Sequence, residues 1–215
     1  MKLNAYETAR FYRMFKSLVQ YINNLDNLIE DAEDFRTAEF DDPQALDQIF
    51  RYGFKDRDLI EAYLSVNPDD FSTEELDIIR KWPEGIDGLF YVERITKNGA
   101  VLIDESSEKV YLMAGLASSP EELFSGWKLP LQIRVILIPW RDRIIFSAVY
   151  SANPDYPDEE TKKSLRKFIW KRAGQIRLLK PFAQNPETVK RNSEMEPAIF
   201  LQGAEAWSES RMTGN

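Results

Sequence analysis

The spacing of the apolar residues changes near residue 85, and this change constrains the fold more than any other feature of the chain. Before it, apolar side chains recur three and four residues apart, the period of one helix face. From Gly88 to Ser151, short runs rich in β-branched and aromatic residues alternate with polar turns, as in β-strands. The sequence therefore predicts an α+β protein in which a helical N-terminal unit packs on an antiparallel β unit.

A long helix is predicted near the N-terminus. Its apolar stripe runs for nearly three heptads through Phe11, Phe15, Leu18, Ile22, Leu25 and Ile29. A stripe of this kind packs against another helix, so we expect it to face the core of the same chain. Self-association of two copies through this helix, giving a homodimer, is the alternative.

Three shorter helices should follow, each opened by a side chain that can cap the first turn. The expected caps are Asp42 before Pro43, then Asp56 or Asp58, and finally Ser72 in a capping box with Glu75. We expect the second of these helices to end at Asn67-Pro68, because the residue before a proline disfavours helical geometry.

Five short strands are predicted in the β unit. They are Leu89–Thr96, Val101–Ile103, Lys109–Ala114, Gln132–Ile138 and Ile144–Tyr150. Asn98-Gly99 between the first two predicts a type I′ hairpin turn with positive φ at both residues. A helical turn is expected from Ser119-Pro120 before the fourth strand. These tight connections favour a five-stranded antiparallel sheet or small barrel, and an open sheet covered by helices is the alternative.

The C-terminal part combines a basic helix with a polar tail. Asp158 can cap a helix that is rich in lysine and arginine. The predicted organisation is a helical unit over 1–85, a β unit with its C-terminal helix over 86–182, and an extended arm or flexible tail over 183–215. Within that arm only 198–201 and Trp207 have enough apolar character to dock.

Charge is unevenly distributed in a chain whose net charge is −8. Residues 21–79 hold 17 acidic and 4 basic side chains, whereas residues 162–180 hold 8 basic and no acidic ones. The two regions can neutralise each other within the fold or solvate two faces. Alternatively, the basic segment attracts an anionic partner.

The composition removes several kinds of chemistry. The chain has no histidine and no cysteine, so it has no imidazole base, no thiolate nucleophile and no Cys/His zinc site. With 9 glycines, no nucleotide-binding fingerprint can be written, and we expect no cofactor. Carboxylates are the remaining candidates for catalysis, but turn and cap roles explain their pairs, which are Asp56/Asp58, Asp69/Asp70 and Asp104/Glu105. No catalytic residue and no metal ligand is predicted.

Bulk features also bear on location. The longest apolar runs are too short to span a bilayer, and the N-terminus lacks a secretory pattern. We therefore expect a cytoplasmic protein that does not contact a membrane.

Two places are candidate partner-binding sites. The first is the basic helix 161–173, where Trp170 lies on the polar face among Lys163, Arg166, Lys167 and Lys171. There an indole among cations can stack on a partner while the cations hold its anions, or it can pack inward. The second is the predicted hairpin tip with Trp140, Arg141 and Arg143, residue types enriched in interaction hot spots. The alternative for the tip is a tryptophan folded back on the β unit.

Several short patterns in fixed order carry a resemblance over roughly residues 11–180. They are Phe11-Tyr12-Arg13, Asp58-Leu59-Ile60 with Asn67-Pro68, Glu74 to Trp82, Gly88 to Arg94, Lys109-Val110-Tyr111 with Gly115-Leu116, Leu129-Pro130 and Leu137-Ile138-Pro139. In these the chain resembles a family of uncharacterised bacterial proteins with a helical N-terminal region and a small antiparallel β region. The resemblance implies a shared architecture and no established activity.

From these features we predict a non-enzymatic protein-interaction or scaffolding module whose partner is another protein. A nucleic-acid-binding protein using helix 161–173 is the first alternative. A carboxylate-based hydrolase is the second.

Overall fold

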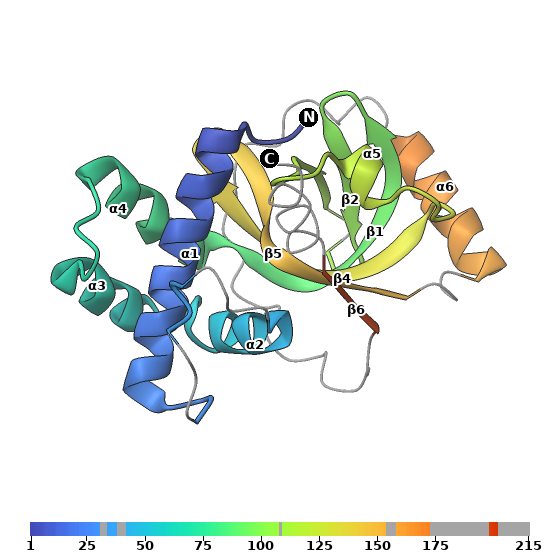
Figure 1. Cartoon of the computed structure of the whole chain (residues 1–215). Coiled ribbons are helices and arrows are strands. Elements are labelled where there is room, and N and C mark those ends of the chain that lie inside the picture. The colour runs from blue at the N-terminus through green and yellow to red at the C-terminus, as the bar shows by residue number, and fades with distance from the viewer. Residues whose placement is uncertain (31–33, 38–41, 108, 154–157, 173–197, 202–215) are drawn as a thin grey trace, which may run out of the picture.

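The computed structural model describes residues 1–30, 34–37, 42–107, 109–153, 158–172 and 198–201. In chain order its elements are α1 (Ala5–Asp26), α2 (Pro43–Gly53), α3 (Arg57–Val66), α4 (Thr73–Arg80), the 3₁₀ turn η1 (Trp82–Glu84), β1 (Ile86–Thr96), β2 (Gly99–Asp104), β3 (Val110–Met113), α5 (Pro120–Leu123), β4 (Leu131–Trp140), β5 (Arg143–Asn153), α6 (Glu159–Arg172) and β6 (Ala198–Leu201). Helices α1 to α4 gather at one end of a curved sheet, and α6 lies at the opposite end (Figure 1). The protein therefore mixes helices and strands as the change in apolar spacing predicts.

The helix starts agree with the local cap signals. Asp42 caps α2, Asp56 rather than Asp58 caps α3, and Ser72 forms the predicted capping box of α4 with Glu75. Each cap satisfies backbone N–H groups that have no partner inside the helix. Because a cap and its first turn span only four residues, the start of each of these helices can be predicted from the sequence without knowledge of the fold.

The apolar stripe of α1 faces the core over most of its length. Phe11, Phe15, Leu18 and Ile22 have no exposed surface. The prediction is wrong at the end of the stripe, because Asn27 takes a left-handed conformation (φ 46°) that ends the helix. Ile29 consequently lies beyond the helix, where it is partly buried against the core, and Leu25, although inside α1, is 56% exposed. A homodimer through α1 is not tested by this packing and would have to use another face of the helix.

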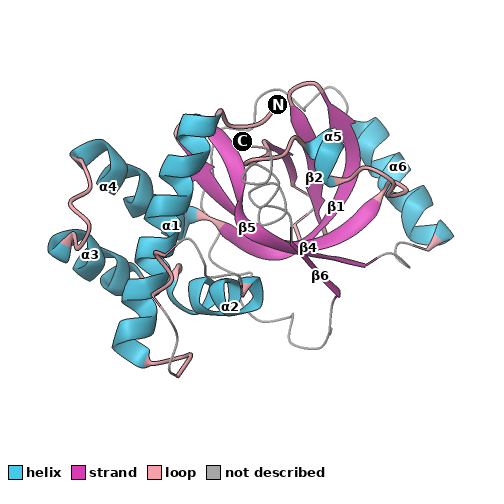
Figure 2. Cartoon of the chain, viewed as in Figure 1, coloured by secondary structure: helices cyan, strands magenta, loops and turns pink. Residues whose placement is uncertain are grey.

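The described strands form one six-stranded, mostly antiparallel sheet in the order β3-β2-β1-β4-β5-β6. Figure 2 shows the curved sheet between helices α1 to α4 and helix α6. The five predicted strands are present, and the sixth, β6, comes from the segment predicted as an arm. A parallel pairing of Met113 with Ile144 joins β3 to β5, so the hydrogen bonding runs around the sheet in a ring.

The first hairpin exists, but its predicted turn type is wrong. Thr96 pairs with Gly99, so the two turn residues are Lys97 and Asn98, and Gly99 opens β2. Gly99 has a φ of +143°, and a Cβ built on it would lie 2.3 Å from the carbonyl oxygen of Met113. Glycine is therefore required here by the close approach of β3 and by its own φ.

A continuous apolar cluster runs through the helical and β regions. Where the two meet, the ring of Phe11 packs against Trp82 and Trp140, with centroids 5.9 and 5.8 Å apart. This contact anchors α1 to the start of the β unit and to the end of β4. No helix in the described ranges is long and apolar enough to cross a membrane.

Candidate interaction surfaces

The tip of the β4–β5 hairpin is shorter than the sequence suggests. Trp140 pairs with Arg143, which leaves a two-residue turn of Arg141 and Asp142. The Trp140 side chain is fully buried, and its ring meets Phe11 edge-on. Trp140 thus adopts the packed alternative, and its indole is not presented to a partner in this structure.

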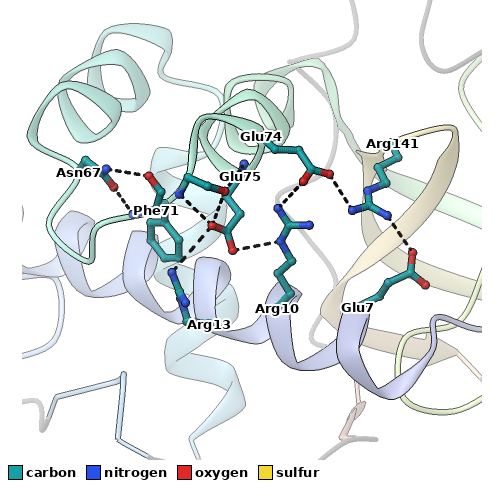
Figure 3. A network of polar contacts seen from close by, with 9 residues as sticks. Glu7, Arg10, Arg13, Asn67, Phe71, Glu74, Glu75 and Arg141 are labelled. Carbon is teal, nitrogen blue, oxygen red and sulfur yellow. Dashed lines mark hydrogen bonds and ion pairs between the residues drawn. The ribbon is translucent and has the colours of Figure 1, made fainter.

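Arg141 holds the turn against the helical unit. It is one of four described non-glycine residues with positive φ, at 54°, a conformation that costs free energy for a side chain with a Cβ. Its guanidinium donates to Glu74 at 2.7 Å and lies 3.6 Å from Glu7 (Figure 3). These ion pairs link the turn between β4 and β5 to the first turns of α1 and α4.

Glu7 of α1 contacts two arginines of the hairpin, Arg141 and Arg143. Its carboxylate accepts from the backbone N–H of Asn4 in the capping box of α1, and from Arg143. Burial by itself raises the pKa of Glu7, but the hydrogen bonds and the charges of Arg143 and Arg141 outweigh it and lower the pKa. Glu7 is therefore ionised at neutral pH and serves as an acceptor.

Arg10 extends the same network along α1 to α4. Its guanidinium contacts both Glu74 and Glu75 at 3.0 Å (Figure 3). The hydrogen bonds from Ser72 and Arg10 overcome the effect of burial and lower the pKa of Glu75. The guanidinium of Arg13 follows one turn later, 3.9 Å from Glu75 and 4.5 Å from the centre of the Phe71 ring.

We call these residues the hairpin-tip network: Glu7, Arg10, Arg13, Glu74, Glu75, Arg141 and Arg143. Each of its carboxylates is paired with arginine, so none is placed as a free base or as a proton donor near neutral pH. The arrangement clamps α1, α4 and the hairpin together. The sequence predicted Arg141 and Arg143 as contact residues and Glu75 as part of a helix cap, and it gave no role in this network to Glu7, Arg10, Arg13 and Glu74. The spacing Asn4-x-x-Glu7, a capping-box pattern, was the available signal.

The basic helix α6 is placed differently from the hairpin tip. Asp158 accepts from the backbone N–H of Thr161 at 2.7 Å, as expected of its cap. Leu165 is buried against Tyr91 of β1 and Ile103 of β2, with Val110 of β3 beside them. This contact seats α6 on the outer face of the sheet and fixes which side of the helix points outward.

The side of α6 that points outward is basic. Lys163, Arg166 and Lys167 are exposed and form no ion pair with any described residue. We call these three side chains the basic face. Lys162 instead pairs with Glu159 at 2.7 Å. This hydrogen bond from Lys162, helped by the charges of Arg166 and Lys163, lowers the pKa of Glu159. The predicted contact residues Trp170 and Lys171 belong to α6, but their side chains lie outside the described part of the chain.

The acidic helices do not cover the basic face. Helices α3 and α4 lie at the end of the sheet opposite α6 (Figure 1). The described structure therefore gives no support to neutralisation of α6 by these helices, one of the two interpretations of the charge pattern.

A second group of ion pairs lies between α2 and the sheet. Arg51 donates to Asp47 at 2.6 Å and also to Asp87 of β1, and Arg134 of β4 lies 3.8 Å from Asp87. Burial raises the pKa of Asp47 despite the nearby guanidinium. The cluster joins α2 to β1 and β4, and sequence reasoning did not find it because its members are up to 87 residues apart.

The predicted carboxylate pairs have structural roles, which are local for Asp56 and Asp104 and long-range for Asp69. Asp56 caps α3, and Asp69 accepts from Ser17 and Arg36. Asp104 accepts from the hydroxyls of Ser106 and Ser107 at 2.8 and 2.6 Å. In the described ranges no three acidic side chains are grouped to hold a metal ion.

A small hollow beside polar groups lies on the sheet between Gln132, Arg134, Ser151 and Asn153. Its cavity of about 20 Å³ has room for roughly one water molecule. Another hollow is a space between apolar core side chains around Phe146.

No family model, no curated protein and no solved structure matches this chain. The resemblance to uncharacterised bacterial proteins therefore rests on the sequence patterns alone.

Proposed function

We propose that this protein is a non-enzymatic interaction module that binds an acidic surface of another protein through the basic face of α6. The observation that carries the proposal is the seating of this helix. Leu165 is buried on the sheet, while Lys163, Arg166 and Lys167 are exposed and contact no carboxylate in the described ranges. Cations presented in this way attract an anionic partner and speed its association.

The charges around the basic face favour a protein over a nucleic acid. Asp158, Glu159 and Glu160 are exposed in the first turn of the same helix, and the whole chain carries −8. A phosphate backbone would be repelled by these carboxylates, and nucleic-acid-binding domains are usually basic as a whole. An extended acidic polypeptide carries at most one charge per about 3.3 Å, roughly half the charge density of duplex DNA at one charge per about 1.7 Å, so these carboxylates repel it less. Nucleic acid is the second candidate because the exposed cations by themselves suit phosphates.

The test compares two variants that lose the same charge. In the first, Lys163, Arg166 and Lys167 are replaced by glutamine. In the matched control, two exposed lysines and one exposed arginine elsewhere, Lys97, Lys128 and Arg57, are replaced in the same way. Glutamine keeps the helix propensity of lysine and arginine, so α6 should remain intact.

Binding is measured by fluorescence anisotropy with two probes, poly-glutamate and a 20-base-pair DNA duplex, at low and at moderate salt. The proposal predicts binding of poly-glutamate that weakens at least about tenfold in the basic-face variant and stays within about twofold in the control. Stronger binding of the duplex, with the same dependence on the basic face, would favour nucleic acid. Equal binding by both variants would overturn the assignment of this surface. The predicted cytoplasmic location is part of the same proposal.

A further inference from the structure

Strand β3, which closes the ring of hydrogen bonds, is shorter than the edge of β5 along which it lies. β5 has 11 residues, whereas β3 has 4. Their contact lies at the start of β5, where Met113 pairs with Ile144 and the Ala114 N–H donates to the Ile144 carbonyl at 2.9 Å. The far half of β5 is therefore not paired by β3, and an uncovered strand edge is a template for another strand.

The C-terminal strand β6 covers this far half of the edge. It runs antiparallel to β5 with the pairs Val149 to Leu201, Tyr150 to Phe200, Ser151 to Ile199 and Ala152 to Ala198. Residues 173–197 separate β6 from α6. The edge is thus completed by a segment distant in sequence and attached by four residue pairs, which is a short ladder for a strand.

We infer that this half of the β5 edge is a strand-docking site that also accepts β6 of a second copy. Every copy carries both the edge and the segment that fits it, so two chains can exchange β6 reciprocally and close a two-fold dimer. Exchange keeps the same residue pairs, so the balance depends mainly on entropy and on protein concentration. A segment on the same chain competes at an effective concentration on the order of millimolar, and the exchanged dimer should therefore grow as the protein approaches that concentration.

Engineered cysteines test this inference in the full chain, which has no cysteine of its own. Ser151 and Ile199 are directly opposite in the described register. Directly opposite residues of antiparallel strands have Cα atoms roughly 4.5–5.5 Å apart, within the roughly 4.4–6.8 Å that a disulfide spans. A chain with both Ser151→Cys and Ile199→Cys should close an internal disulfide at low concentration. A mixture of the two single-cysteine chains should give a mixed disulfide dimer whose yield rises with concentration.

Two controls separate exchange from collision. Lys97→Cys replaces an exposed residue of the first hairpin turn, away from β6, and its chain should not cross-link selectively with Ile199→Cys. Adding Phe200→Pro and Leu201→Pro to the Ile199→Cys chain removes two successive backbone donors from β6, one of which faces β5 in an antiparallel ladder, and should abolish the mixed disulfide.

The outcomes are distinct. An internal disulfide with no mixed dimer at about 1 mM, the effective concentration of the tethered segment, would show that the edge is closed only within one chain and would overturn the inference. A mixed dimer equally abundant with Lys97→Cys, or insensitive to the two added prolines, would also overturn it. These results do not depend on the basic face of α6. A negative result here would therefore leave the proposed function unaffected, and a negative binding result would leave this inference unaffected.

Discussion

Replacing Trp140 with alanine tests whether the hairpin tip belongs to the core or to a contact surface. The side chain is fully buried against Phe11. A buried tryptophan removes about 200 Å² from water, which at about 25 cal/mol per Å² corresponds to ~5 kcal/mol. Loss of the edge-on ring contact adds about 1 kcal/mol. The indole N–H has no acceptor among the described residues, and removing this donor offsets about 1–3 kcal/mol. We therefore expect Trp140→Ala to destabilise the protein by about 3–5 kcal/mol.

The measurement is urea unfolding at pH 7, followed by circular dichroism. Trp140→Phe is the matched variant, because it keeps an aromatic ring beside Phe11 and removes the unsatisfied N–H. It should cost less than about 2 kcal/mol. Binding of poly-glutamate by the folded fraction of either variant should equal that of the unchanged protein. A Trp140→Ala protein with an unchanged unfolding midpoint and weakened binding would refute the assignment of this residue to the core.

Three further predictions follow from other parts of the structure. In Gly99→Ala the new methyl group is strained by the positive φ and clashes with the carbonyl of Met113. Gly126→Ala is strained only by its positive φ of 83°, which costs about 1–2 kcal/mol, so the Gly99→Ala protein should have a much lower melting temperature than the Gly126→Ala protein. The pKa of Glu7 is lower in the folded than in the unfolded protein. The ionised Glu7 carboxylate therefore stabilises the fold fully above pH 4.5, and this stabilisation is lost as the pH falls through the pKa of the folded state. Urea midpoints should therefore drop less between pH 7 and pH 3 in Glu7→Gln than in the unchanged protein. Ser72→Ala removes the cap of α4 and should cost about 0.5–2 kcal/mol in the same unfolding assay.

The sequence by itself determined the elements whose causes are local. Asp42 and Ser72 start their helices because a cap and the N–H groups it satisfies lie within four residues. The stripe of α1 reaches the core because its spacing matches a helical face. The prediction fails after Ile22, since Leu25 is exposed and the left-handed Asn27 ends the helix before Ile29. The strands of the β unit were legible for the same reason, since β-branched and aromatic runs fit a pleated surface.

Tertiary structure alone decided how these elements are used. Arg141 and Glu74 are 67 residues apart, and no spacing in the chain connects them. Tryptophan is a residue type enriched in interaction hot spots, yet Trp140 packs against Phe11 of α1 and belongs to the core. The basic charge of α6 was visible in the sequence, but only the contact of Leu165 with the sheet shows which cations point outward. Local patterns determine local geometry because they act through neighbouring backbone groups, whereas exposure and charge pairing depend on which distant segments pack together.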